Sequence, residues 1–144
     1  MVGLVRKLAD AVLWTAADAA RGAAAELAGD GGLSGAYRCL MQLLDDYRRA
    51  HRGQGVQAAA RLFDDPPAEI GDVRVDAAFA ALAEHLARQD GWTPPLWAFD
   101  ESRQAKPWWF VSGVRSWHAM ALVESPLAFR KRGVFLTASA LDRV

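Results

Sequence analysis

The sequence predicts an all-α protein, a helical bundle with an irregular Trp/Pro-rich C-terminal layer that contains at most a minor short strand pair. Across residues 2–90, apolar residues recur every three or four positions, which is the period of an amphipathic helix. Alanine, the strongest helix former, is abundant in the same stretch. Beyond residue 91 this period is lost, and tryptophan and proline become frequent.

Length and composition favour one folded domain over residues 1–144. The chain is 52% hydrophobic and 24% charged, which is typical of globular proteins, and 144 residues can enclose a real core. We expect residues 1–90 to form the helical bundle and residues 91–144 to form an aromatic-rich part that packs on it. A segment as short and irregular as the second part would not fold alone.

The first two helices are expected over residues 2–28 and from Ser34 to about residue 50. The second half of the first helix is rich in alanine, so its face permits close approach of another helix, in this chain or in a partner. Gly22 is expected to weaken it, and the glycines at 29–32 end it. Ser34 is a suitable N-cap for the second helix, whose polar face is expected to expose Asp45 and Asp46 to solvent.

A short helix over about 56–64 is expected to stop at the two prolines that follow. The clearest helix then begins with Asp72 as its N-cap and ends before Gly91, a natural C′ residue. Its apolar stripe repeats at intervals of four, three and four positions, and Asp76 and Glu84 fall outside this stripe. The stripe consists of Val75, Phe79, Leu82 and Leu86.

The C-terminal part contains only short elements. A brief turn is expected at 94–99, and the apolar run at 108–111 has the composition of a strand for which no partner strand is evident. A helix is expected from Ser112 or Gly113 to about residue 124, followed by a short turn that begins at Ser125. Residues 134–136 are expected to be extended or irregular, and Thr137 is expected to cap a last turn.

Composition argues against several functional classes. Lys and Arg together number 17, as do Asp and Glu, so the chain lacks the basic excess that is usual in general nucleic-acid binders. The single Cys39 excludes an intrachain disulfide and a cysteine-based zinc site, and we expect neither a metal nor a cofactor. The sequence has no run of 18 apolar residues and no signal-peptide pattern, so we expect a cytoplasmic protein without a membrane span.

Catalytic motifs are absent from the sequence, so we expect a protein that is not an enzyme. His51, His85 and His118 have no second His or Cys at metal-ligand spacing, and no Ser lies in a GxSxG elbow. The acidic pairs at 45–46 and 64–65 are interpreted as a solvated helix face and a helix terminator. A small enzyme or a structural adaptor is the second alternative to the function that the resemblance below implies.

Residues 91–118 concentrate the features that suggest binding. Five of the six tryptophans lie there, and large amphipathic rings are common at interface hot spots. Such rings also seal irregular segments onto a core, and we expect about half of them to do so. The basic cluster at 130–132 could meet phosphate or an acidic protein surface, or it could be a solvated helix end. The candidate partner-binding residues are Trp97, Trp108, Trp109, Phe110, Trp117, Phe129, Arg130, Lys131 and Arg132.

The last half of the chain carries a pattern of four short motifs. It comprises AEHLA at 83–87, TPPLW at 93–97, PWWF at 107–110 and ALVESPLAFRKRGVF at 121–135. This pattern resembles the C-terminal segment of actinobacterial proteins that act as antitoxins or regulators of nucleotidyltransferase-like toxins. Some of those proteins carry an N-terminal helix-turn-helix, whereas this chain shows two long helices in its first third and no short-turn recognition pair.

The resemblance implies a non-enzymatic, antitoxin-like protein. Such a protein would neutralise a partner toxin, encoded next to it, through protein–protein contacts, as a hetero-oligomer or with a second copy of itself. The alternative is a DNA-binding transcriptional regulator of its own operon, acting through Arg130, Lys131 and Arg132.

Overall fold

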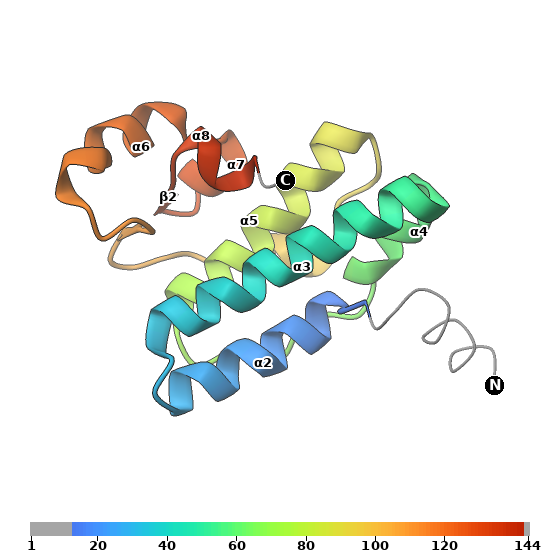
Figure 1. The fold of residues 1–144 in the computed structure, drawn as a ribbon, viewed down its shortest axis with the longest axis horizontal. Coiled ribbons are helices and arrows are strands. Elements are labelled where there is room, and N and C mark those ends of the chain that lie inside the picture. The colour runs from blue at the N-terminus through green and yellow to red at the C-terminus, as the bar shows by residue number, and fades with distance from the viewer. Residues whose placement is uncertain (1–12, 143–144) are drawn as a thin grey trace.

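The computed structural model describes residues 13–142, and these residues confirm the all-α class with a minor strand pair. Figure 1 shows the arrangement of the helices. The first helix is predicted over residues 2–28, but residues 13–15 are not helical and α2 begins at Ala16, so the predicted continuity is wrong there. The part of the predicted helix before residue 13 lies outside the described residues. The α-helices are α2 (Ala16–Ala28), α3 (Gly32–Gln54), α4 (Val56–Ala60), α5 (Val73–Asp90), α6 (His118–Glu124), α7 (Leu127–Arg130) and α8 (Ala138–Leu141). The short elements are the 3₁₀ turns η1 (Arg61–Phe63), η2 (Leu96–Phe99) and η3 (Arg115–Trp117), and the strands β1 (Trp109–Phe110) and β2 (Val134–Phe135).

Helix α2 begins with a capping box and packs its alanine face on α3. The Thr15 hydroxyl accepts a hydrogen bond from the backbone N–H of Asp18 at 3.1 Å, and the Asp18 carboxylate accepts one from the Thr15 N–H at 3.1 Å. A Cβ at Gly22 would lie only 3.1 Å from the Trp14 ring and 3.2 Å from Cys39 Sγ, so this glycine fits a close contact. The alanine face is therefore used within the chain.

Two predictions for α3 are wrong. The helix begins at Gly32, before Ser34, and no side chain caps it. Asp46 is completely buried and does not face solvent. Its carboxylate accepts hydrogen bonds from the Trp14 backbone N–H at 2.9 Å and from Gln42 Nε2 at 3.0 Å. The Trp14 N–H lies just before α2 and is partly buried, so it needs a hydrogen-bond acceptor, which the Asp46 carboxylate supplies.

Helix α5 is the central helix of the fold. Asp72 caps it through the N–H of Arg74 at 2.9 Å, and Gly91 ends it in the left-handed conformation at φ 81° and ψ 28°, as predicted. One side of α5 packs on α3, and η2, α7 and β2 pack on it from the C-terminal part (Figure 1). The helix is therefore buried well beyond the predicted stripe, and Asp76 and Glu84 lie in the interior. A helix covered from several sides must find internal partners for its acidic side chains.

The two strands form a parallel pair, with Trp109 opposite Val134 and Phe110 opposite Phe135. The Trp109 N–H donates to the Gly133 carbonyl at 2.8 Å, and the Val111 N–H donates to the Phe135 carbonyl at 2.9 Å. Parallel strands need a crossover connection, and here η3, α6 and α7 provide it. The strand predicted at 108–111 therefore does have a partner. It lies in the segment 134–136, which the sequence predicts to be extended or irregular.

Several of the tryptophan rings close the core. Trp92 Nε1 donates to the Tyr47 hydroxyl at 2.8 Å, which donates to Asp90 Oδ2 at 2.6 Å. Burial and the hydrogen bond to Asp90 raise the pKa of Tyr47. Trp97 Nε1 donates to the Phe63 carbonyl at 2.9 Å, so this ring also faces inward.

Within residues 13–142, every helix is too short or too polar to span a bilayer.

Candidate protein-binding surface

Helix α6 is apolar on both its inner and its outer face. Its sequence is HAMALVE, in which Ala121 is buried on the inner side while Met120 and Val123 are 50% and 77% exposed. Trp117, one turn earlier, is 51% exposed. A helix that is apolar all round is normally covered on all sides. The outer face of α6 is therefore apolar and yet exposed to solvent.

The exposed apolar side chains continue on either side of α6. We define the α6 surface as the large apolar side chains of residues 114–127 that are at least 43% exposed. It consists of Val114, Trp117, Met120, Leu122, Val123 and Leu127. Figure 1 shows α6 at the outer edge of the molecule, away from α2 and α4. Exposed apolar groups that gather on one short segment mark an interaction site more than scattered ones do.

Ring stacking and hydrogen bonds at both ends of α6 hold the helix in place. The His118 ring stacks on Phe110 with 4.3 Å between ring centroids, and His118 Nε2 lies 3.2 Å from the Ser112 carbonyl oxygen. At the other end of the helix, buried Ser125 accepts a hydrogen bond from the Leu136 N–H at 2.9 Å. These contacts hold α6 against β2 and its surroundings, so the outward direction of its apolar face is set by the fold.

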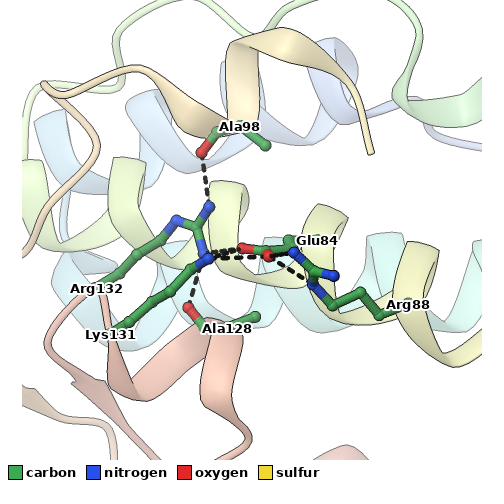
Figure 2. A network of polar contacts seen from close by, with 6 residues as sticks. All are labelled: Glu84, Arg88, Ala98, Ala128, Lys131 and Arg132. Carbon is green, nitrogen blue, oxygen red and sulfur yellow. Dashed lines mark hydrogen bonds and ion pairs between the residues drawn. The ribbon is translucent and has the colours of Figure 1, made fainter. Parts of the chain in front are cut away.

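A buried carboxylate ties the C-terminal part to α5. Glu84 Oε1 lies 2.7 Å from both Arg132 Nη1 and Lys131 Nζ, and Glu84 Oε2 lies 2.6 Å from Arg88 (Figure 2). Arg132 also donates to the carbonyl oxygens of Ala98 and Ala128, each at 2.8 Å. One acidic side chain is therefore shared by three cations from two parts of the chain.

The electrostatics of this network favour an ionised carboxylate. Burial by itself would raise the pKa of Glu84, but hydrogen bonds from Lys131, Arg132 and Arg88 outweigh it and lower the pKa to about 2. Three positive charges face one negative charge in the network, so this region carries a local excess of positive charge although the whole chain is neutral.

A pocket of about 460 Å³ opens beside this network. It lies between the segment 104–108, which leads into β1, and the segment 130–133, which follows α7. Its titratable lining residues are all basic. The lining consists of Gln104, Ala105, Lys106, Pro107, Trp108, Arg130, Lys131, Arg132 and Gly133. We call this hollow the basic pocket.

Gly133 fixes the aromatic wall of the basic pocket. Its φ of 77° suits glycine, and a Cβ there would lie 2.9 Å from both Trp108 Cδ1 and the Ala105 carbonyl oxygen. The Trp108 ring also packs on Phe135 at 4.9 Å between centroids, while 63% of its surface is exposed. The indole is thus held in place and still presents most of its surface to solvent.

The predicted site residues separate into outer and inner groups. Trp108, Trp117, Arg130 and Lys131 are exposed, and Trp97 and Phe110 are half-buried. Trp109, Phe129 and Arg132 are buried at 8%, 0% and 2% exposure, so these three side chains do not lie on the surface of the fold. Trp109 packs edge-on against Tyr37, and Phe129 packs edge-on against His85. Their roles are to close the core and to hold Glu84.

The sequence interpretation missed Met120, Leu122, Val123 and Leu127 as surface candidates. It singled out large aromatic rings and charges, whereas these residues are aliphatic or contain sulfur. A signal was present, because residues 117–127 contain apolar residues at too many angular positions for one buried stripe. An apolar segment with no polar face predicts either complete burial or a docking surface.

Another pocket, of about 230 Å³, lies between α3 and α5 and includes the most enzyme-like pair. His51 Nε2 is 4.0 Å from Asp90 Oδ2, which is too far for a hydrogen bond. The same carboxylate oxygen already accepts a hydrogen bond from the Tyr47 hydroxyl. His51 and Asp90 are therefore not hydrogen-bonded to each other in this structure.

Among residues 13–142, no cluster of three or more His, Cys, Asp or Glu side chains could hold a metal ion. Cys39 is buried, and burial raises the pKa of its thiol, as expected for an unreactive cysteine. Searches of protein-family models, curated proteins and solved structures find no significant match to this chain.

Proposed function

We propose that this protein is a non-enzymatic, antitoxin-like binding protein that neutralises a partner toxin, a nucleotidyltransferase-like enzyme, through protein–protein contacts. The observation that carries the proposal is the α6 surface, in which six large apolar side chains remain exposed on a well-anchored segment. The resemblance of residues 83–135 to antitoxin and regulator proteins supplies the class of partner. The cytoplasmic location expected from the sequence is kept as part of the proposal.

Energetics indicate that the α6 surface needs additional contacts to hold a partner. Fully burying one Val, Leu or Met side chain contributes about 1.5–3 kcal/mol. Because these side chains are already partly covered, burying the rest of all six contributes on the order of 5–10 kcal/mol. Association costs about 4–15 kcal/mol in lost motional freedom. The α6 surface alone would thus give weak binding, and the polar contacts around it must add to stable association.

The alternative function, a DNA-binding regulator, receives less support. Lys131 and Arg132 both donate to Glu84, and Arg130 donates to the carbonyl oxygens of Val123 and Ser125. These contacts hold the three cations around one pocket, whereas a phosphate backbone is bound by cations that follow its track. The zero net charge of the chain points the same way.

Co-expression with the product of the adjacent open reading frame tests the proposed function. We expect the two proteins to co-purify, and we expect the wild-type chain to relieve any toxicity of the neighbour. Val123→Asp places a charge in the α6 surface and should lower the affinity at least tenfold, since an unpaired charge is costly in an interface. Gln57→Asp, an exposed change on α4, is the matched control and should bind as the wild type does.

Circular dichroism should show the same helix content for both variants and the wild type. The proposal fails if the wild-type chain neither co-purifies with the neighbouring product nor reduces its toxicity. It also fails as a proposal about α6 if Val123→Asp and Gln57→Asp bind equally well.

A further inference from the structure

We propose that the basic pocket binds aspartate or glutamate side chains of the partner, in a segment whose apolar residues cover the α6 surface. This inference deepens the proposed function and rests on it, because it assigns the chemistry of the partner segment. The segment would be acidic at one end and apolar along the rest.

The charged residues that line the basic pocket are all positive. Lys106, Arg130, Lys131 and Arg132 line it, and no acidic residue does. Glu84 is the carboxylate that faces Lys131 and Arg132, and it also serves Arg88. One carboxylate thus leaves these cations incompletely neutralised, which a carboxylate from outside would correct.

The hydrogen-bond donors at the basic pocket also favour an acidic ligand. Arg132 is 2% exposed, and its Nε has no hydrogen-bond partner among the described residues. The Lys131 side chain is 39% exposed, so its ammonium group is accessible while it contacts Glu84. Because Arg132 Nε is buried, the accessible donor is the Lys131 ammonium group, from which an entering carboxylate can accept a charge-assisted hydrogen bond.

The pocket also has the size and the wall that a side chain needs. Its volume of about 460 Å³ is within the range of small-ligand sites, so one or two acidic side chains fit. Trp108 forms an exposed wall that Gly133 and Phe135 hold in position. The ring covers the methylene groups of a bound Asp or Glu, while the lysine and arginine side chains receive its carboxylate.

Arg130 connects the basic pocket with the α6 surface. It lines the pocket, and its Nη2 donates to the Val123 carbonyl at 3.0 Å and to the Ser125 carbonyl at 2.9 Å. Val123 is the most exposed large apolar residue of α6, and Leu127 lies one turn before Arg130 on α7. A single docked segment can therefore contact the apolar residues and place an acidic residue in the pocket.

A protein segment fits these features better than a nucleic acid does. A phosphate backbone needs a track of cations, whereas here the cations surround one hollow and are followed by apolar side chains. The neutral net charge also removes the long-range attraction that nucleic-acid binders use.

The 144-residue chain can be tested with a defined probe and without the natural partner. The probe is a short peptide of alternating aspartate and leucine, and its control replaces each aspartate with asparagine. The readout is the indole N–H signal of Trp108 in a ¹⁵N–¹H NMR spectrum, assigned with Trp108→Phe. We expect the acidic peptide to shift this signal in a saturable manner and the amide peptide to leave it unchanged.

The variants sharpen the test. Lys106→Glu should weaken binding of the acidic peptide by roughly tenfold, since it reverses a charge at the pocket. Arg61→Glu reverses an exposed charge on η1 and should bind the peptide as the wild type does. Equal binding of both variants overturns the inference, and so does an unchanged Trp108 signal with the acidic peptide.

A single-stranded oligonucleotide is run in parallel. If it shifts the Trp108 signal and the acidic peptide does not, the pocket is a nucleic-acid site and the inference is overturned. Failure of the peptide test leaves co-purification with the toxin to stand or fall separately, because that experiment uses Val123→Asp and does not depend on the pocket.

Discussion

Glu84 and Arg132 form a 2.7 Å ion pair across 48 positions of the sequence, with side chains that are only 1% and 2% exposed. Glu84 belongs to the central helix α5, and Arg132 follows α7 in the C-terminal part. The pair therefore joins the two parts of the chain through a contact that water does not screen. Its removal should be felt by the whole fold.

We expect Glu84→Gln to lower the free energy of unfolding by about 3–5 kcal/mol, because it leaves Arg132 buried without its counter-charge. Chemical denaturation followed by circular dichroism measures the change. Glu101→Gln removes an exposed carboxylate from a loop and should change stability by less than about 0.5 kcal/mol. A similar cost for both variants would show that the buried pair contributes little.

Stability should fall with acid in a window set by Glu84. Its pKa is lowered from 4.5 to about 2 in the folded state, so the unfolded chain takes up the proton first as the pH falls. The contribution of Glu84 is complete above about pH 4.5 and is lost toward pH 2, by up to about 1.4 kcal/mol per pH unit. A ¹³C NMR titration of the Glu84 carboxyl checks this, and a midpoint at or above 4.5 would refute it.

Ser125→Ala should destabilise the junction between α6 and β2. The Ser125 hydroxyl donates to carbonyl oxygens and accepts from the Leu136 N–H at 2.9 Å, in a buried setting. Without it, that N–H is unpaired, which costs about 1–3 kcal/mol. Ser116→Ala, at an exposed position of η3, is the control for thermal unfolding. Equal melting temperatures for the two variants would argue against this role.

Two glycines with similar backbone angles should respond differently to alanine. Gly91 and Gly133 have φ values of 81° and 77°, but an added Cβ has nothing within 4 Å at Gly91 and two atoms at 2.9 Å at Gly133. We expect Gly91→Ala to cost about 1 kcal/mol in unfolding free energy. Gly133→Ala should cost more and should also shift the NMR signal of Trp108. Equal costs and an unchanged signal would contradict the close contact.

Local signals in the sequence located most of the helices, although they misplaced the start of α3 and the burial of Asp46. Asp72 and Gly91 bracket α5 correctly, because capping depends on residues within one turn of the helix end. The glycines and prolines between α2 and α5 also separate the helices at the expected places. The C-terminal part was recognised as irregular for the same reason, since its helical period is absent.

The candidate site was less predictable, because exposure depends on contacts between distant residues. Trp108 and Trp109 are neighbours in sequence, but the pairing of β1 with β2 turns one outward and the other inward. Likewise, nothing near Glu84 in the sequence shows that Lys131 and Arg132 will reach it. Val123 was overlooked because a lone aliphatic residue is ordinarily assigned to the core.

The arrangement of Glu84 also determines the order in which the chain can mature. During synthesis, helix α5 is complete before residues 127–135 leave the ribosome, so Glu84 then has only Arg88 of its own helix as a cation partner, and Lys131 and Arg132 arrive later. Until then, water rather than α7 has to solvate Glu84, and α5 cannot be covered on that side without cost. The front helices can therefore collapse early, but their last layer closes only when Arg132 arrives.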